Sequence, residues 1–304
     1  MGLKEIKDIL ISKIDEEYII ENVPMAEHSS FKAGGNADLM VLPQSIDQLK
    51  EVLQILAGCD YPYMILGNGS NILVRDGGYR GIMVKMGSAF DDVQVDGNRV
   101  VCGAGALLSV AAKTAAAAGL AGLEFASGIP GSIGGAVFMN AGAYDGEMKF
   151  VLEKARVISK DGSADRYMTP DELDMGYRHT VLHETGDIVA EAVFNLEEGD
   201  IDEIKAKIAD LTQRRNSKQP VSFPSAGSFF KRPTGYFAGK LVQDAGLKGL
   251  TVGGAQVSEL HSGFVINIGG ATATDILQLM EIVQQTVMDK FGVMLEPEVR
   301  IIGE

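Results

Sequence analysis

Cysteine and histidine are scarce in this sequence, and their scarcity argues against several classes of site. The two cysteines, Cys59 and Cys102, are isolated, without a C-x-x-C pair or a neighbouring histidine cluster. Isolated thiols of this kind are typical of free, buried cysteines and favour neither a disulfide framework nor a metal centre. The four histidines are scattered apart from His179 and His183, on a segment that we interpret as a loop leading into a strand. We therefore expect no bound metal.

Long apolar runs and dense basic runs are also missing. No stretch reaches the roughly 18 apolar residues of a membrane helix, and residues 1–22 lack the apolar core of a signal peptide. We therefore expect a cytoplasmic protein without membrane attachment. The net charge is −14 and the sequence contains no dense run of Lys and Arg. A nucleic-acid partner is therefore not expected, because such recognition needs a basic surface.

The pattern of apolar residues predicts a mixed fold of helices and strands in two or three domains. Predicted helices cover residues 3–22, 46–58, 107–118, 202–215, 236–245 and 274–290. Predicted strands cover residues 62–66, 72–75, 81–85, 92–94, 98–102, 187–197, 263–268 and 294–302, with a further strand pair around Asp161-Gly162. Asp96-Gly97 lies between two of these strands and predicts a tight hairpin turn.

Two glycine-rich segments are the main functional signal. The first glycine loop (residues 67–71, GNGSN) and the second glycine loop (residues 128–135, GIPGSIGG) each follow an apolar stretch. Glycine allows several backbone N–H groups to approach one anion. Together the loops indicate a long ligand whose phosphates are held from two sides, although two purely structural turns remain an alternative. Neither loop matches the P-loop or the dinucleotide-binding fingerprint.

The segment that contains the second glycine loop is unusually rich in small residues. Nine of the 22 residues from 127 to 148 are Gly or Ala, which leaves room for a flat ring system or a diphosphate against the backbone. Asn140 lies in this segment, and its carboxamide can offer a donor and an acceptor to the edge of a heterocycle.

Three further segments carry residues with chemical potential. Arg178 stands in a glycine-started turn and can bind a carboxylate or phosphate with two hydrogen bonds, or can simply be a surface arginine. Ser228 precedes two phenylalanines without a hydrolase elbow motif, so we interpret it as a positioned proton donor or a turn cap. Lys231 adds positive charge nearby. Glu298, near the C-terminal end, is a candidate acid or an ordinary solvated strand residue.

These motifs, taken in order, resemble those of the UDP-N-acetylenolpyruvoylglucosamine reductase family, also called UDP-N-acetylmuramate dehydrogenases. The resemblance runs from about His28 to the C-terminus. It rests on SFKAGG (30–35), GNGSN (67–71), GIPGSIGGAVFMNAGAY (128–144), GYR (176–178), AGSFFKRP (226–233) and LEPEVRIIG (295–303). The compact length is similar to the shorter type of that family, which lacks an inserted substrate-covering loop and its tyrosine.

The resemblance implies an α+β architecture, with a vanillyl-alcohol-oxidase-like (PCMH-like) FAD-binding fold of two subdomains followed by a C-terminal α+β substrate domain. We expect an N-terminal helical segment over 1–29, an FAD-binding domain over 30–198 (subdomains of about 30–85 and 86–198), and a substrate domain over 199–304. The implied cofactor is non-covalent FAD, with NADPH as reductant. The implied reaction, a step of peptidoglycan synthesis, reduces the enolpyruvyl group of a UDP sugar. We expect a monomer that binds small molecules.

By the same resemblance, Arg178 holds the substrate carboxylate, Ser228 donates the proton, and Glu298 assists that step. Substrate contacts are expected from Tyr177, Lys231 and His261. Cofactor contacts are expected from Gly67, Asn68, Gly69, Ser70, Asn71, Gly128, Pro130, Gly131, Ser132, Gly134, Gly135, Asn140, Ala141, Gly142 and Val189.

One departure from the family pattern concerns the diphosphate of the substrate. Relatives commonly have Lys before the histidine of residues 257–264, and this chain has Leu260. If that Lys contacts phosphates in relatives, the contact passes here to Lys231, Arg232 or Lys240. Two other functions stay open at this level: a different FAD oxidoreductase of the same fold, such as an alcohol oxidase, and a flavin- or nucleotide-binding protein without turnover.

Overall fold

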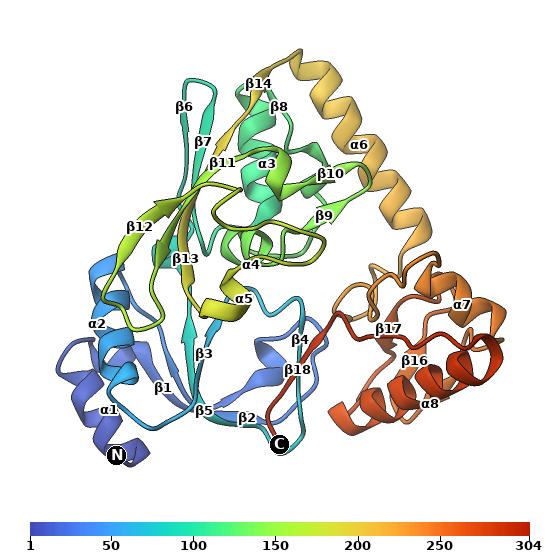
Figure 1. Cartoon of the computed structure of the whole chain (residues 1–304), viewed down its shortest axis with the longest axis horizontal. Helices are drawn as coiled ribbons and strands as arrows, with labels where there is room; N and C mark the ends of the chain where they lie inside the picture. The colour runs from blue at the N-terminus through green and yellow to red at the C-terminus, as the bar shows by residue number, and fades with distance from the viewer. The chain divides into compact units, whose positions relative to one another are not determined.

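The chain folds into two compact units that are interleaved in sequence (Figure 1). The computed structural model describes all 304 residues. Unit 1 comprises Met1–Glu21, Leu39–Asn68 and Gly81–Gln213. Unit 2 comprises Asn22–Asp38, Gly69–Arg80 and Arg214–Glu304. The domain boundaries expected from the sequence were continuous stretches, whereas two short N-terminal segments belong to the C-terminal unit.

Hydrogen bonds explain why these two segments belong to unit 2. The Asn267 side chain donates to the Phe31 carbonyl at 2.9 Å and accepts from the Ala271 N–H at 3.1 Å. The Asp76 carboxylate accepts from the N–H groups of Ala273 and Thr274, both at 2.8 Å, and from the Thr274 hydroxyl at 2.6 Å. Asp76 therefore supplies acceptors for the otherwise unpaired first N–H groups of a helix that is distant in sequence.

The centre of unit 1 is an antiparallel five-stranded sheet. Its strand order is β12 (Asp165–Met168), β11 (Leu152–Ile158), β13 (Ile188–Asn195), β7 (Arg99–Gly103) and β6 (Val93–Asp96). Asp96 pairs with Arg99 across the predicted tight turn, where Gly97 has a φ of +61°. The helices α3 (Leu108–Ala117) and α4 (Ile133–Phe138) pack on this sheet. Their small residues (Ala111, Ala112, Ala115, Ala136) are buried and permit that close packing.

A second sheet has the order β1-β2-β5-β3, and β3 is parallel to β5. The remaining elements around these two sheets are α1 (Leu3–Ile11), β1 (Ile19–Pro24), β2 (Asn36–Val41), α2 (Ile46–Ala57), β3 (Tyr63–Leu66), β5 (Tyr79–Lys85), β8 (Leu120–Ala121), β9 (Gly142–Ala143), β10 (Gly146–Glu147), α5 (Leu182–Thr185) and β14 (Glu197–Glu198). Short 3-10 turns cover Glu16–Tyr18, Met25–Glu27, Ser88–Phe90, Glu124–Ala126 and Met148–Phe150.

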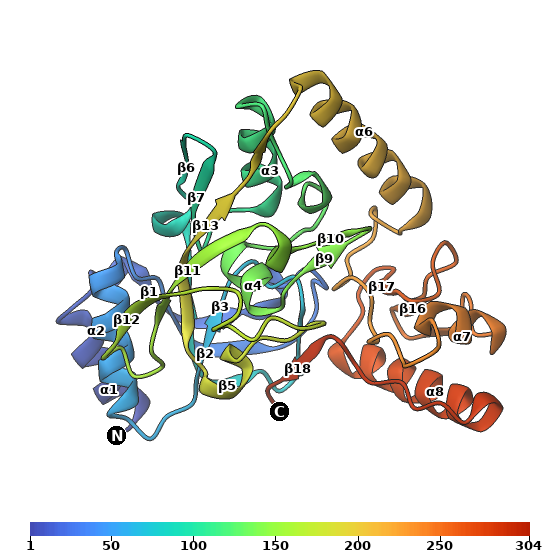
Figure 2. The same ribbon diagram turned by 45° about the horizontal axis from the view of Figure 1, so that its top comes forward.

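Unit 2 is built around α8 (Ala273–Phe291). Its buried residues Ile276, Leu279, Val283 and Val287 recur at helical spacing and form one apolar stripe. Figures 1 and 2 show α8 alongside α7 (Ala238–Asp244) and the three-stranded sheet β15 (Thr251–Val252), β16 (Ala255–Val257) and β17 (Val265–Asn267). Two parallel strands, β4 (Ile72–Val74) and β18 (Arg300–Ile302), complete unit 2. The long helix α6 (Ile201–Lys218) carries the chain from unit 1 to unit 2. No helix combines the length and apolar character that crossing a bilayer requires.

Three sequence expectations about local structure were wrong. The helix predicted over 3–22 ends at Ile11, because Ser12 caps it and the β-branched Ile19 and Ile20 favour the strand β1. The strand predicted over 294–302 covers only β18, because Pro297 has no N–H with which to continue a ladder. His183 lies on the short helix α5 and not at the start of a strand.

Both cysteines are free, but only Cys102 is buried, and burial raises the pKa of its thiol to about 12.

Candidate active site

The two glycine loops meet within unit 1. A Cβ atom added at Gly67 would lie 2.3 Å from the Ser132 hydroxyl oxygen, so only glycine permits this approach. The next residue, Asn68, donates from its side chain to the Pro130 carbonyl at 2.8 Å. Residues from both loops are therefore in direct contact. Such contact is required if the two loops form one binding site.

The second glycine loop is fixed by its backbone and leaves N–H groups available. Gly131 accepts from the Leu108 N–H at 3.1 Å, and the Ile133 N–H donates to Ala106 at 2.8 Å. Between these bonds the N–H of Ser132 meets no acceptor within unit 1, although Ser132 is only 3% exposed. Buried backbone N–H groups nearly always have a partner. The loop therefore fits the phosphate of a bound cofactor.

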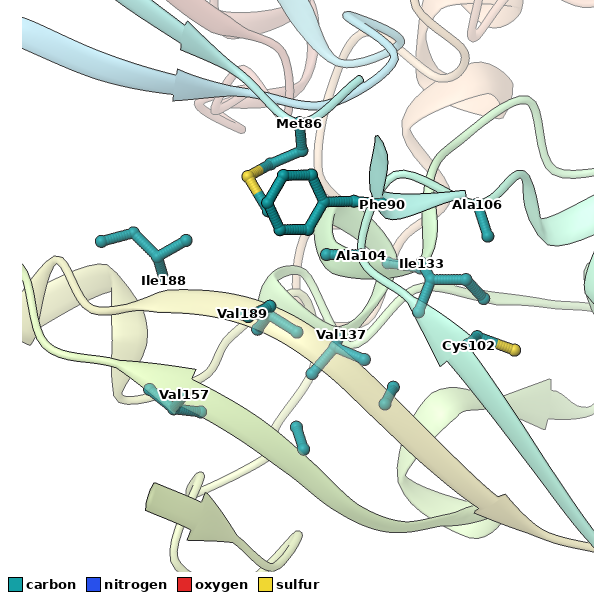
Figure 3. Packing of buried hydrophobic residues seen from close by; sticks show 14 of the residues in the cluster. Met86, Phe90, Cys102, Ala104, Ala106, Ile133, Val137, Val157, Ile188 and Val189 are labelled. Carbon is teal, nitrogen blue, oxygen red and sulfur yellow. The ribbon is translucent and has the colours of Figure 1, made fainter. Parts of the chain in front are cut away.

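The small residues of 127–148 pack closely on neighbouring backbone, and the space for a cofactor predicted from them stays a prediction. Gly134 donates its N–H to the Ala104 carbonyl at 2.8 Å, and a Cβ at Gly134 would lie 2.9 Å from the Ala104 Cβ. Figure 3 shows Val137 of α4 beside Val189 of β13 in the buried cluster. Val189 is buried, and its predicted contact with the cofactor stays a prediction.

Asn140 is used differently from our expectation. Its side-chain nitrogen donates to the Gly176 carbonyl at 2.8 Å and to the Glu147 carboxylate at 3.2 Å, and its side-chain oxygen accepts from the Lys149 N–H at 3.1 Å. Both donors are therefore engaged within the protein, and the residue is fully buried. No donor remains for the edge of a heterocycle.

Arg178 is presented by a closed turn. Gly176 and His179 exchange two backbone hydrogen bonds, at 3.0 and 3.3 Å. Arg178 itself has a φ of +53°, a left-handed conformation that few non-glycine residues adopt. Its guanidinium lies 5.1 Å from the centre of the Tyr177 ring and donates to the Gly142 carbonyl at 3.4 Å. The half-buried guanidinium therefore has contacts within unit 1, and its predicted contact with a substrate carboxylate stays a prediction.

In unit 2, Ser228 and Glu298 lie on neighbouring segments. Ser228 forms a bridge pair with Phe264, and the next residue, Phe229, accepts the N–H of Glu298 at 2.8 Å. Ser228 is exposed and Glu298 is half-buried. The structure therefore brings together two of the three predicted catalytic residues, and both are accessible to a ligand.

A contact between Glu298 and the first glycine loop was not predicted from the sequence. Asn71 donates from its side chain to the Glu298 carbonyl at 3.2 Å and accepts the Arg300 N–H at 3.0 Å. The two residues are 227 positions apart, and a sequence pattern does not indicate contacts between such distant residues. Gly69 is equally constrained, because a Cβ there would lie 2.0 Å from the His28 carbonyl oxygen.

The basic residues that were candidates for a diphosphate differ in their surroundings. Lys240 pairs with Asp244 at 2.5 Å on α7, and Arg232 stacks over the Phe237 ring at 3.9 Å. Lys231 lies 3.5 Å from the Glu296 carboxylate, and Leu260 is exposed.

His261 is held as a neutral imidazole. Burial lowers its pKa, and its Nδ1 accepts the Gly263 N–H at 3.1 Å. This hydrogen bond assigns the proton to Nε2, which is then a donor.

Comparison with known proteins defines the class. Residues 37–166 match the model of an FAD binding domain, and residues 219–302 match the C-terminal domain of UDP-N-acetylenolpyruvoylglucosamine reductase. A glucose oxidase variant, Phl p 4, shares the fold at a TM-score of 0.50 and 14% identity, covering 64% of this chain and 44% of its own. The protein is therefore an FAD-dependent oxidoreductase with the PCMH-like flavin-binding fold.

Full-length relatives define the family. The UDP-N-acetylenolpyruvoylglucosamine reductase of Alkaliphilus oremlandii is 51% identical over 97% of both chains. That of Clostridium perfringens is 53% identical over 95% of this chain and 94% of its own. The crystal structure of the Thermus caldophilus reductase superposes with a TM-score of 0.80 at 36% identity, covering 92% and 97% of the two chains. The chain belongs to the UDP-N-acetylenolpyruvoylglucosamine reductase family.

Proposed function

We propose that this protein uses NADPH to reduce the enolpyruvyl group of UDP-N-acetylglucosamine enolpyruvate, giving UDP-N-acetylmuramate for peptidoglycan synthesis. The observation that carries the proposal is the hydrogen bond from the Glu298 N–H to the Phe229 carbonyl at 2.8 Å, which joins the segments of Ser228 and Glu298 in a chain of this family. This pairing of segments supports a shared role for the two residues.

The two glycine loops are the proposed holders of FAD. The Ser132 N–H and the close contact of Gly67 with Ser132 fit a phosphate group. When bound there, FAD would supply the hydride-transfer chemistry that links NADPH to the substrate double bond. The side chains of the protein bind the substrate, stabilise the negative charge that develops on it and donate the proton that completes the reduction.

Arg178 is the proposed ligand of the substrate carboxylate. Hydride addition to one carbon of the double bond places carbanion character on the other carbon, and that charge spreads into the carboxylate. A fixed guanidinium stabilises the charge as it develops, by about 3 kcal/mol or more for a preorganised donor. The hydrogen bond of Arg178 to Gly142 supports this role because it removes reorganisation from the reaction.

Ser228 is the proposed donor of the proton that completes the reduction. A serine hydroxyl is a weak acid, so its proton must be replaced from a neighbouring group. Glu298, on the adjacent segment, is the proposed source, directly or through water. Tyr177, Lys231 and His261 are the proposed substrate contacts, with the His261 Nε2–H as a neutral donor.

We further propose that the enzyme acts as a monomer in the cytoplasm, where NADPH and nucleotide sugars are available, and binds no nucleic acid. The acidic sequence without a basic run supports the last point.

Anaerobic spectroscopy of the two half-reactions tests the proposal. NADPH should bleach the flavin absorbance, and UDP-N-acetylglucosamine enolpyruvate should restore it. In Ser228→Ala, bleaching should be unchanged while restoration slows by about 10²- to 10⁴-fold, the usual contribution of a general acid. Bleaching without restoration in the parent protein would indicate another flavin oxidoreductase, and absence of flavin chemistry would indicate a binding protein. Equal loss of both half-reactions in Ser228→Ala would refute the proton-donor role.

A further inference from the structure

The buried side chain of Asn140 lies between the second glycine loop and the Arg178 turn. Asn140 follows α4 and has a φ of +41°, so its backbone leaves the helix sharply. Its amide orientation is unambiguous, because the Gly176 carbonyl and the Glu147 carboxylate both require a donor and the Lys149 N–H requires an acceptor.

The Gly176 carbonyl is the point at which Asn140 meets the turn. This oxygen accepts the His179 N–H at a long 3.3 Å and the Asn140 side chain at 2.8 Å. The side-chain bond is the shorter of the two, and it fixes one end of the turn that carries Arg178. Loss of the Asn140 donor would leave this partly buried carbonyl with only the longer bond from His179.

The same short segment also holds the guanidinium. Gly142, two residues after Asn140, begins the hairpin formed by β9 and β10 (Figure 2) and accepts from the Arg178 guanidinium at 3.4 Å. A Cβ at Gly142 would lie 2.7 Å from the Gly146 carbonyl oxygen, so the hairpin has little freedom there. Residues 140–142 thus bind both the backbone of the turn, at Gly176, and the guanidinium of Arg178.

We propose that Asn140 is a positioning residue that acts through Arg178 and does not contact the cofactor. The inference rests on the proposed function of Arg178 as ligand of the substrate carboxylate. The conformation of Arg178 is left-handed and therefore unfavourable for an arginine, so the turn needs external support, which Asn140 supplies.

Asn140→Asp is the direct test, since it keeps the shape and the acceptor for Lys149 but places a carboxylate oxygen against the Gly176 carbonyl. FAD content and flavin reduction by NADPH should stay within about twofold of the parent. Flavin reoxidation by UDP-N-acetylglucosamine enolpyruvate should slow by about tenfold, the effect of one lost buried hydrogen bond. Asn98→Asp, which adds the same charge on an exposed hairpin turn, is the matched control and should leave both half-reactions unchanged.

Lowering the pH should restore the Asn140→Asp variant. The new carboxyl faces Glu147, which is paired with Lys149 at 3.3 Å, and becomes a donor to Gly176 once protonated. A rate of reoxidation that rises as pH falls, relative to the parent, is the expected signature. Asn140→Ser, too short to reach Gly176, should show the same split between half-reactions without this pH response, and replaces Asn140→Asp if the latter folds poorly.

Combination with Arg178→Lys separates this inference from the proposed function. Arg178→Lys alone should slow reoxidation, and adding Asn140→Asp should slow it no further, because both changes remove one interaction. An unchanged rate in Arg178→Lys would refute the role of Arg178 and the inference with it. A slow Arg178→Lys that Asn140→Asp slows by a further tenfold would refute the inference alone, as would loss of FAD affinity in Asn140→Asp and Asn140→Ser.

Discussion

Because Gly67 lies against Ser132, the addition of one methyl group at Gly67 tests the proposed FAD site. Gly67→Ala adds a Cβ that would lie 2.3 Å from the Ser132 hydroxyl oxygen and 3.5 Å from the Ser132 Cβ. The second distance is an ordinary contact, so the conflict involves a single atom. Gly67 is not among the residues with a left-handed φ, and alanine therefore meets no backbone obstacle there. Any effect of the substitution reports on the contact between the loops.

The expected magnitude follows from the burial of Ser132. At 3% exposure, its hydroxyl has little room to rotate, so the two loops must separate by about 1 Å or the serine must adopt a strained conformation. Overpacking of this kind costs about 1–3 kcal/mol. If the separated loops hold the same FAD phosphates, this cost appears in cofactor binding as a rise in Kd of roughly 5- to 150-fold.

Equilibrium binding of FAD to the apoprotein, followed by quenching of flavin fluorescence, measures this change. Ser132→Ala keeps the backbone N–H but removes the clashing oxygen, so the double variant Gly67→Ala/Ser132→Ala should bind FAD about as tightly as Ser132→Ala alone. A Gly67→Ala protein with unchanged FAD affinity but a lowered free energy of unfolding would show that the loops are structural turns. A double variant as weak as Gly67→Ala would show that the contact with Ser132 is not the cause.

Two further substitutions have defined outcomes. Glu298→Gln should leave flavin reduction by NADPH intact and slow reoxidation by the enolpyruvyl substrate by about tenfold or more, as expected for a group that replenishes a proton; full activity in stopped-flow absorbance would remove Glu298 from the mechanism. Asp76→Asn should weaken the start of α8 by about 1 kcal/mol, seen as faster hydrogen exchange at Ala273 and Thr274. Burial raises the pKa of the Asp76 carboxyl, but the hydrogen bonds from Thr274 and Ala273 lower it by more, so the net pKa lies below its usual value. The contribution of Asp76 is therefore present above the unfolded-state pKa and is lost as pH falls through the folded-state pKa, so the parent should approach the variant only in acid.

Local patterns were sufficient to predict much of this fold. The apolar stripe of α8, the Asp96-Gly97 turn and the helix α2 follow from periodicity and turn chemistry within a few residues of sequence. The wrong predictions came from local patterns that pairing with distant segments overrides. Residues 3–22 have a charged, amphipathic helical pattern, but their last residues form the strand β1, because they pair in a sheet that the pattern does not reveal. Tertiary pairing overrides propensity at such positions.

The candidate site was predictable in its residue types but not in its connections. The spacing of glycines indicated two phosphate-binding loops, and the structure shows that Gly67 and Ser132 touch. The carboxamide of Asn140 was expected to face a ligand, because a polar side chain among small residues resembles a binding group. Its actual partner, the Gly176 carbonyl, is a backbone atom far along the chain, and sequence alone carries no signal for such a partner.

The first glycine loop performs two tasks with adjacent residues. Gly67 and Asn68 contact the second loop in unit 1, while Asn71, only three residues on, holds the backbone of Glu298 and Arg300 in unit 2. A loop with larger residues would not serve both, because Gly69 between them has a φ of +64° and lies against the His28 carbonyl. The segment proposed to hold FAD therefore also binds the backbone of Glu298, the proposed proton source, just before β18. Substitutions at Gly69 should consequently disturb cofactor binding and proton delivery together, whereas those at Gly67 should disturb cofactor binding first.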